Sequence, residues 1–292
     1  MAMIEAALAI LAALFWSVGI IIIRKGLEKA NFFSAILVIT IIGTIFFGVL
    51  TLLLVPLNAV TFWSVLFFAF AGLLAPGLGR LFYYNGMSRL GASINASVFT
   101  TYPIFGAIVA IVLLNERPTY GIGAGIGFIV LGAVLIERNL HGGGQSTKLS
   151  RVNMIFPLLG AVTFASSQAF RKIGLNLYNE PIIGVALGYL TALCLFAALI
   201  ALSAKLRKSV SLGLQTFRLF WRAGLCLCGG WFFAFYALRY GDVSVVVPLF
   251  ASEPFFILLL SYVFLKGLEK ITLKLLIGTF IIILGVSFVT MF

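Results

Sequence analysis

The sequence predicts an all-α polytopic membrane protein, and three observations support this fold class. Hydrophobic residues make up 62% of the 292 residues, charged residues only 10%, and the mean hydropathy is +1.19. Because a soluble domain carries roughly 25% charged residues, these side chains are too few to cover a water-exposed surface. The apolar residues also form continuous runs of about 20 residues, the length of a membrane-spanning helix, without the alternation of a barrel strand.

Ten apolar runs follow one another, and each is predicted to form one transmembrane helix. A backbone in lipid must satisfy its hydrogen bonds within the segment, which favours helices. The first run lacks a basic flank and a small-residue cleavage site, so it is expected to be a retained span. In chain order the predicted helices cover residues 4–23, 33–55, 62–84, 92–114, 120–136, 154–173, 182–204, 218–238, 244–266 and 272–291.

A polar linker divides the chain near its midpoint. Residues 141–150 are rich in glycine and polar side chains, so residues 1–140 and 151–292 are predicted to be two five-helix units. Short patterns recur about 150 residues apart, including Tyr102-Pro103 and Glu253-Pro254. Because five is odd, the second unit must cross the membrane in the opposite sense. This predicts two inverted repeats around a central cavity.

The positions of the basic residues predict the orientation in the membrane. Most of the 20 Lys and Arg residues lie in the gaps after the first, third, fifth, seventh and ninth runs. The positive-inside rule then places both termini outside the cytoplasm. Four basic residues are assigned to the extracytoplasmic side, namely Arg117, Arg171, Lys172 and Arg239.

The sequence predicts no nucleic-acid partner, metal or cofactor. The net charge of +12 is scattered over short gaps and forms no long basic tract. The cysteines Cys194, Cys226 and Cys228 lie inside apolar runs, and His141 is the single histidine, so no ligand cluster is expected. A glycine-rich stretch at 121–127 resembles a dinucleotide loop, but it lies in an apolar run, where small residues favour close helix packing.

Glu253 is the principal candidate for chemistry. It lies near the middle of the predicted helix 244–266, where an ionised side chain facing lipid would cost at least about 3 kcal/mol. Its repeat counterpart is Tyr102, and each residue precedes a proline, Pro254 or Pro103, that is predicted to break the helix. Two interpretations stay open for Glu253: a site for a substrate amine or a proton, and a protonated carboxyl that bonds between helices.

Other polar and aromatic side chains are expected to line the same cavity. Arg80 either meets a substrate carboxylate or extends to lipid phosphate, and each aromatic residue has membrane packing as its alternative role. Gly91 and Gly241 are predicted hinges because glycine permits unusual backbone changes. The predicted cavity residues are Trp16, Arg80, Tyr84, Asn95, Tyr102, Gln168, Trp231, Tyr236, Ser252 and Glu253.

Several motifs resemble those of the ten-helix EamA-type drug/metabolite transporters. They are Phe15-Trp16-Ser17, Arg89-Leu90-Gly91-Ala92-Ser93, Tyr102-Pro103 and Leu114-Asn115-Glu116-Arg117-Pro118-Thr119, with Tyr236-Ala237-Leu238-Arg239-Tyr240-Gly241 and Glu253-Pro254 in the second half. The segment Lys266-Gly267-Leu268-Glu269 departs from the compact turn of the first half. The resemblance implies a secondary transporter in a prokaryotic plasma (inner) membrane that exports amino acids or related amphipathic metabolites.

Secondary transport by alternating access is therefore the predicted function, with a small-molecule substrate and the lipid bilayer as partners. The sequence contains no GxxxxGK[ST] phosphate loop and no recognisable spacing of nucleophile, base and orienting group, so it is not expected to be an enzyme. Two alternatives are a membrane-embedded lipid-modifying enzyme and a channel. Both a monomer and a homodimer are compatible with the sequence.

Overall fold

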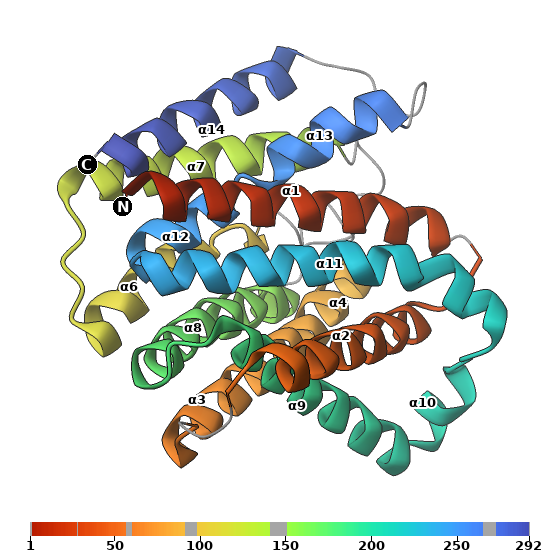
Figure 1. Cartoon of the computed structure of the whole chain (residues 1–292). Coiled ribbons are helices and arrows are strands. Elements are labelled where there is room, and N and C mark those ends of the chain that lie inside the picture. The colour runs from red at the N-terminus through yellow and green to blue at the C-terminus, as the bar shows by residue number, and fades with distance from the viewer. Residues whose placement is uncertain are drawn as a thin grey trace.

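The computed structural model describes residues 2–27, 29–56, 60–90, 98–140, 151–264 and 273–291, and every regular element in these ranges is a helix (Figure 1). The first half contains α1 (Ala2–Gly26), α2 (Phe32–Leu54), α3 (Phe62–Gly72), the π-helix η2 (Leu73–Leu78), α4 (Gly79–Leu90), α6 (Tyr102–Leu114) and α7 (Tyr120–Leu140). The second half contains η3 (Arg151–Met154), α8 (Ile155–Leu177), α9 (Pro181–Leu202), α10 (Ala204–Ser209), α11 (Leu214–Tyr240), α12 (Val243–Phe250), α13 (Glu253–Phe264) and α14 (Leu273–Met291). The predicted all-α fold is confirmed.

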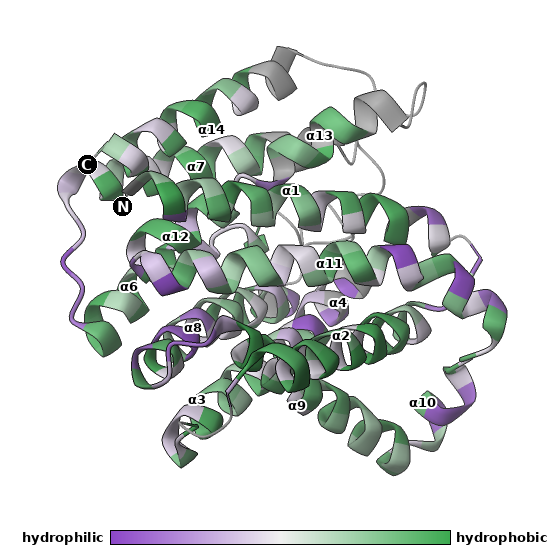
Figure 2. Cartoon of the chain, in the orientation of Figure 1, coloured by the Kyte–Doolittle hydropathy of each residue, from purple (hydrophilic) through white to green (hydrophobic). Residues whose placement is uncertain are grey.

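The described helices have the composition of membrane spans. Five segments are long and apolar enough to cross a bilayer: 3–23, 32–54, 62–83, 181–202 and 214–240. Four shorter segments, at 102–114, 120–135, 243–257 and 277–291, are also apolar. Apolar side chains such as Leu52 and Phe280 cover the outward faces (Figure 2), where a soluble protein would expose polar groups. The chain is thus an integral membrane protein, while the count of ten spans stays a prediction, because α8 belongs to neither group.

The packing partners of the first half recur in the second half. α1 packs along α11 (Figure 1), and α8 packs correspondingly against α3, η2 and α4. Similarly, α1 contacts α12 and α13, whereas α8 contacts α6. The pairs α2 with α9, α6 with α12 and α7 with α14 join corresponding spans of the two halves. Exchanging the halves therefore leaves the packing pattern unchanged, as a pseudo-twofold relation requires.

In the turn between α6 and α7, Asn115, Glu116 and Thr119 each have a distinct structural role. Asn115 ends α6 in the left-handed conformation, with φ 55°, which asparagine tolerates better than most residues. Thr119 accepts a hydrogen bond from the backbone N–H of Ile122 at 3.2 Å and so caps the start of α7. The carboxylate of Glu116 leaves the turn and bonds to the second half of the chain. One short motif thus ends a helix, starts the next and ties the two halves together.

A close helix pair, α7 with α14, connects the two halves away from the cavity. A Cβ atom on Gly125 would lie 2.8 Å from the Gly285 carbonyl oxygen, and one on Gly285 would lie 2.8 Å from the Gly125 carbonyl oxygen. By contrast, Cβ atoms on Gly123 and Gly127 would meet no described atom within 4 Å. The glycine-rich stretch therefore supports close helix packing through one of its faces.

Candidate functional site

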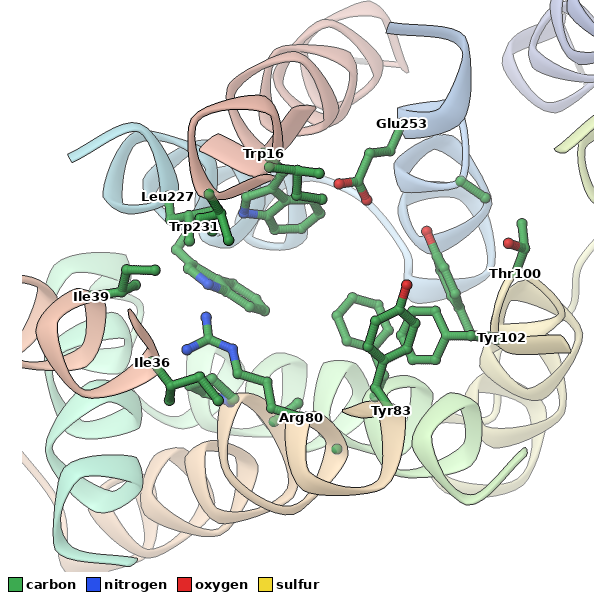
Figure 3. A pocket seen from close by; sticks show the side chains of 18 of the residues that line it. Trp16, Ile36, Ile39, Arg80, Tyr83, Thr100, Tyr102, Leu227, Trp231 and Glu253 are labelled. Atoms are coloured by element: carbon green, nitrogen blue, oxygen red, sulfur yellow. The ribbon is translucent and has the colours of Figure 1, made fainter. Parts of the chain in front are cut away.

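A cavity of about 220 Å³ lies between the two halves (Figure 3). It is lined by α1, α2, η2, α4, α8 and α11, and by the beginnings of α6 and α13 with the turns that precede them. Its residues on α1 lie in the second half of that helix, and those on α2 lie in the first half. The cavity is therefore displaced from the middle of the molecule toward the turn between α1 and α2.

Two interrupted helices supply Tyr102 and Glu253 to the cavity. Glu253 is the first residue of α13, which follows α12 after a two-residue turn, and Tyr102 is the first residue of α6. A residue with a side-chain hydroxyl precedes each of them. The hydroxyl of Thr101 donates to the Val98 carbonyl at 2.6 Å, and the hydroxyl of Ser252 donates to the Leu249 carbonyl at 2.7 Å. Both breaks are thus built in the same way, with the hydroxyl satisfying a carbonyl that the interrupted helix leaves without its usual partner.

The prolines occupy the beginnings of the new helices. Pro103 is at the first turn of α6, and Pro254 is the second residue of α13. A proline is tolerated there because the first N–H groups of a helix have no intrahelical acceptor. The helix interruption therefore lies just before each proline, in the turn that ends at Tyr102 or Glu253.

Ser17 holds the beginning of α13 against α1. Its hydroxyl oxygen lies 2.7 Å from the Ala13 carbonyl and 3.1 Å from the Glu253 carbonyl. Ser17 is fully buried, so this contact fixes the backbone at Glu253. The Glu253 carboxylate points into the cavity (Figure 3). Ser17 belongs to the Phe15-Trp16-Ser17 motif, but its partner is 236 residues away and no sequence pattern connects the two.

Arg80 faces Glu253 from another part of the cavity. It is the second residue of α4, directly after η2, where Ala75 has the non-helical angles φ −151° and ψ 122°. The guanidinium points into the cavity (Figure 3). Arg80 therefore lines the cavity, as one of its two predicted roles requires. Cation and anion line opposite parts of one small space.

Aromatic rings form the wall between these charges. The ring of Trp16 lies 4.9 Å from that of Trp231 and 5.1 Å from that of Phe250 in edge-to-face arrangements. Phe164 packs 4.8 Å from Tyr102 and 6.5 Å from Trp16. Rings with these separations are in mutual contact, so the wall is one continuous aromatic cluster.

The remaining predicted residues have varied positions. Gln168 is fully buried behind the wall, where its Oε1 accepts a hydrogen bond from Arg171 at 2.6 Å. Tyr236 packs 4.6 Å from the Phe232 ring, and neither Tyr236 nor Ser252 lines the cavity. Tyr83 of α4 lines the cavity, while the side chain of the predicted Tyr84 in the same helix is outside the part of the chain that the structure describes. Two predicted residues, Asn95 and Gly91, lie outside the described residues.

At the end of the molecule away from the α1–α2 turn, charged side chains bond to the helix ends that meet at the junction of α11 and α12. The carboxylate of Glu116 accepts hydrogen bonds from the N–H groups of Val243 and Ser244 at 2.9 and 2.8 Å. Lys172 donates to the carbonyls of Leu238 and Gly241, both at 2.8 Å. An anion at a helix N-terminus and a cation at a helix C-terminus are each favourable. The two side chains thus stabilise both helix ends that meet at the junction.

Gly241, which was predicted to be a hinge, lies at this junction and packs closely against α1. Its φ of −121° and ψ of 166° form an extended conformation that any residue can adopt. A Cβ atom there would lie 2.8 Å from Cβ of Glu5, which is 9% exposed. Close packing against α1, and not backbone freedom, explains the glycine in this conformation.

The cavity has the donors of an organic-ligand site. Among the described residues, no group of three or more His, Cys, Asp or Glu side chains is placed to hold a metal ion. The cavity instead combines a guanidinium, a carboxylate, tyrosine hydroxyls and aromatic faces. Such a set suits a small molecule that carries separated charges and an apolar portion.

Comparisons with known proteins identify what the chain is similar to. The EamA-like transporter family matches the chain twice, at residues 3–138 and 152–291. An uncharacterized transporter of Archaeoglobus fulgidus is 27% identical over 288 residues, which cover 97% of both chains. An uncharacterized transporter of Clostridium kluyveri is 26% identical over 136 residues, covering 44% of this chain and 42% of that protein.

A solved structure, titled only as the crystal structure of a protein, has the same fold. Its TM-score is 0.80 at 19% identity, and the alignment covers 97% of this chain and 95% of that one. At this identity the similarity concerns the fold alone. The double match and the named relatives are what point to transport, as opposed to the lipid-modifying enzyme considered above.

Proposed function

Because the chain belongs to the EamA-like transporter family, we propose that it is a secondary transporter that carries small zwitterionic metabolites, amino acids above all, by alternating access. The observation that supports this substrate class is that Arg80 and Glu253 line the same cavity. A carboxylate binds a guanidinium through paired hydrogen bonds, and an ammonium group binds a carboxylate. A free amino acid presents both groups on one carbon atom.

The size and lining of the cavity favour a small substrate with an apolar side chain. Its volume of about 220 Å³ is below the roughly 300–1,000 Å³ of pockets for drug-sized ligands. Trp16 and Trp231 offer aromatic faces between the charged groups. A hydrophobic or aromatic amino acid satisfies both conditions, because its side chain can pack on the rings while its charged groups bind Arg80 and Glu253.

The asymmetric position of the cavity supports the proposal of alternating access. The cavity lies toward the α1–α2 turn, while Glu116 and Lys172 close the α11–α12 junction. With both termini extracytoplasmic, as the basic residues predict, the closed end faces outward and the cavity is on the cytoplasmic side. A pseudo-twofold exchange of the two halves would give the outward-open state. This arrangement supports export across the plasma membrane.

Transport into reconstituted liposomes tests this proposal. Purified protein in proteoliposomes is offered a panel of labelled amino acids, with unlabelled amino acids as competitors and protein-free liposomes as the control. We expect uptake that saturates and that the same amino acid competes. Flux that rises linearly with concentration would favour a channel, and absence of saturable flux across the panel would contradict the substrate class.

A further inference from the structure

Arg171 is a buried cation directly behind the aromatic wall of the cavity. It is 2% exposed, although the distribution of basic residues assigned it to the extracytoplasmic side. Its Nη1 donates to Gln168 Oε1 at 2.6 Å, and its Nη2 donates to the Ala75 carbonyl. Its guanidinium carbon lies 4.2 Å from the centre of the Trp231 ring and 5.2 Å from that of Phe235.

The hydrogen-bond and ring partners that the structure describes for Arg171 are neutral. A buried charge is usually paired with an opposite charge, since its desolvation is costly. Within the described parts of the chain, the recorded hydrogen bonds of Arg171 go to an amide oxygen and a backbone carbonyl. Aromatic faces also stabilise the guanidinium through cation–π interactions. These contacts hold the cation in place without neutralising its charge, so its field acts on the neighbouring cavity.

Arg171 contacts the part of the cavity wall that is next to Arg80, and it adds a positive charge there. Trp231 and Ala75, which Arg171 touches, both line the cavity, and Ala75 belongs to the η2 break that precedes Arg80. Arg80 lines the same cavity as these two contact residues, so Arg171 adds a second positive charge behind this part of the wall. An anionic group bound between Trp231 and Arg80 would be attracted to both cations.

We infer that Arg171 is a specificity-determining positioning residue, which holds Trp231 and the η2 break in place and makes this part of the cavity selective for a carboxylate. The inference rests on the proposed transport of zwitterions and adds a second cation to the site. Arg80 contacts the carboxylate of the substrate, while Arg171 acts through Trp231, Ala75 and its electric field. A substrate with an uncharged group at this position loses the benefit of both cations.

Competition by paired ligands tests the role of Arg171. The probes are phenylalanine and leucine with their carboxamides, used as competitors of labelled amino-acid uptake in proteoliposomes. The readout is the ratio of inhibition constants, carboxamide over amino acid, which does not depend on the amount of active protein. We expect Arg171→Gln to lower this ratio about tenfold, the effect of losing one nearby charge interaction. We expect Arg171→Lys to retain the ratio within about threefold, because the charge is kept.

The matched control is Arg222→Gln on α11. Arg222 is an exposed arginine whose guanidinium lies 5.4 Å from the Trp221 ring, so the same substitution removes a stacked cation outside the cavity. The ratio of inhibition constants in Arg222→Gln should equal that of the wild type. An unchanged ratio in Arg171→Gln, or a ratio in Arg171→Lys as low as in Arg171→Gln, would overturn the inference while leaving saturable transport intact.

A second variant keeps the inference testable even if Arg171→Gln does not insert. Arg80→Gln retains Arg171, so it should still prefer the amino acid over its carboxamide by at least about threefold. Complete loss of preference in Arg80→Gln would overturn the role of Arg171. Absence of saturable uptake in the wild type would instead refute the proposed function, so the two failures are distinguishable.

Discussion

Tyr102 and Glu253 each begin a helix directly after an interruption, and both side chains line the same cavity. The two residues are related by the duplication of the chain, because each follows a hydroxyl residue that bonds three residues back and each precedes a proline. The duplication therefore produced two equal backbone breaks with different side chains. A neutral phenol stands in one half where the other half has a carboxylate, and this difference gives the cavity its charge asymmetry.

The carboxylate of Glu253 should be required for binding a substrate ammonium. We expect Glu253→Gln to lower transport at least about tenfold, since it removes one charge-assisted interaction. Initial rates of saturable uptake in proteoliposomes measure this difference.

The control for this variant is Glu180→Gln, which removes a carboxylate at the beginning of α9, away from the cavity. Both variants need the same membrane insertion and thermal stability as the wild type. Wild-type rates in Glu253→Gln would return this residue to a purely structural role, in which a protonated carboxyl bonds between helices.

Gly230→Ala should reduce the cavity through Trp16. A methyl group on Gly230 would collide with Cδ1 and Nε1 of the Trp16 indole, whose ring is confined by Trp231 and Phe250. Overpacking of this kind costs about 1–3 kcal/mol, and relief requires the indole to move toward the cavity. We expect about a tenfold higher KM for the transported amino acid. Gly48→Ala, where a Cβ would meet nothing within 4 Å, is the control, and equal KM values for both variants would refute the effect.

Gly125→Ala should weaken the packing of α7 against α14. The added methyl would lie 2.6 Å from Cγ2 of Val289 and 2.8 Å from the Gly285 carbonyl. We expect the apparent free energy of unfolding in detergent to fall by about 1–3 kcal/mol. Gly127→Ala on the same helix meets nothing within 4 Å and should be neutral or slightly stabilising, since alanine favours helices. A similar loss in both variants would mean that α7 and α14 do not approach each other as described.

Glu116→Ala should loosen the closed end of the molecule. The change deprives the N–H groups of Val243 and Ser244 of a charged acceptor, and such a bond contributes about 1.5–3 kcal/mol. We expect lower thermal stability, together with faster labelling of a cysteine placed at Asp242 by a membrane-impermeant thiol reagent. Arg117→Gln alters the charge of the same turn at an exposed position and is the control. Labelling that is equally slow in both variants would argue against a closing role for Glu116.

The positions of the helices could be predicted largely from apolar runs, because lipid imposes one length and one composition on every span. The predicted segment 182–204 corresponds to α9 at Pro181–Leu202, and 120–136 begins where α7 begins, at Tyr120. The interruption at η2 was missed, although Pro76 and Gly77 in the run 62–84 were a usable signal. A long apolar run does not reveal a break inside it, because both pieces remain apolar.

The cavity was harder to predict than the helices. Charge in an apolar context identified Glu253 and Arg80, and both line the cavity. Gln168, which is polar but uncharged, was predicted to line the cavity as well, but it bonds to Arg171 and lies behind the wall. Arg171 was assigned to the extracytoplasmic side from the distribution of basic residues along the chain, and it is buried. Whether a polar side chain faces a cavity, a neighbour or water depends on helix rotation, which a single sequence specifies only weakly.

Counterflow in proteoliposomes tests the central claim most directly, namely that a zwitterion crosses the membrane by binding in the cavity between Arg80 and Glu253. Vesicles are loaded with an unlabelled amino acid that competes in the uptake panel, and entry of the labelled form is followed. The account predicts transient accumulation of label above the equilibrium level, because a carrier exchanges bound substrate between its two states, and a marked loss of this overshoot in Arg80→Gln and Glu253→Gln. Label entry that is indifferent to internal substrate, or an overshoot unchanged in both variants, would contradict it.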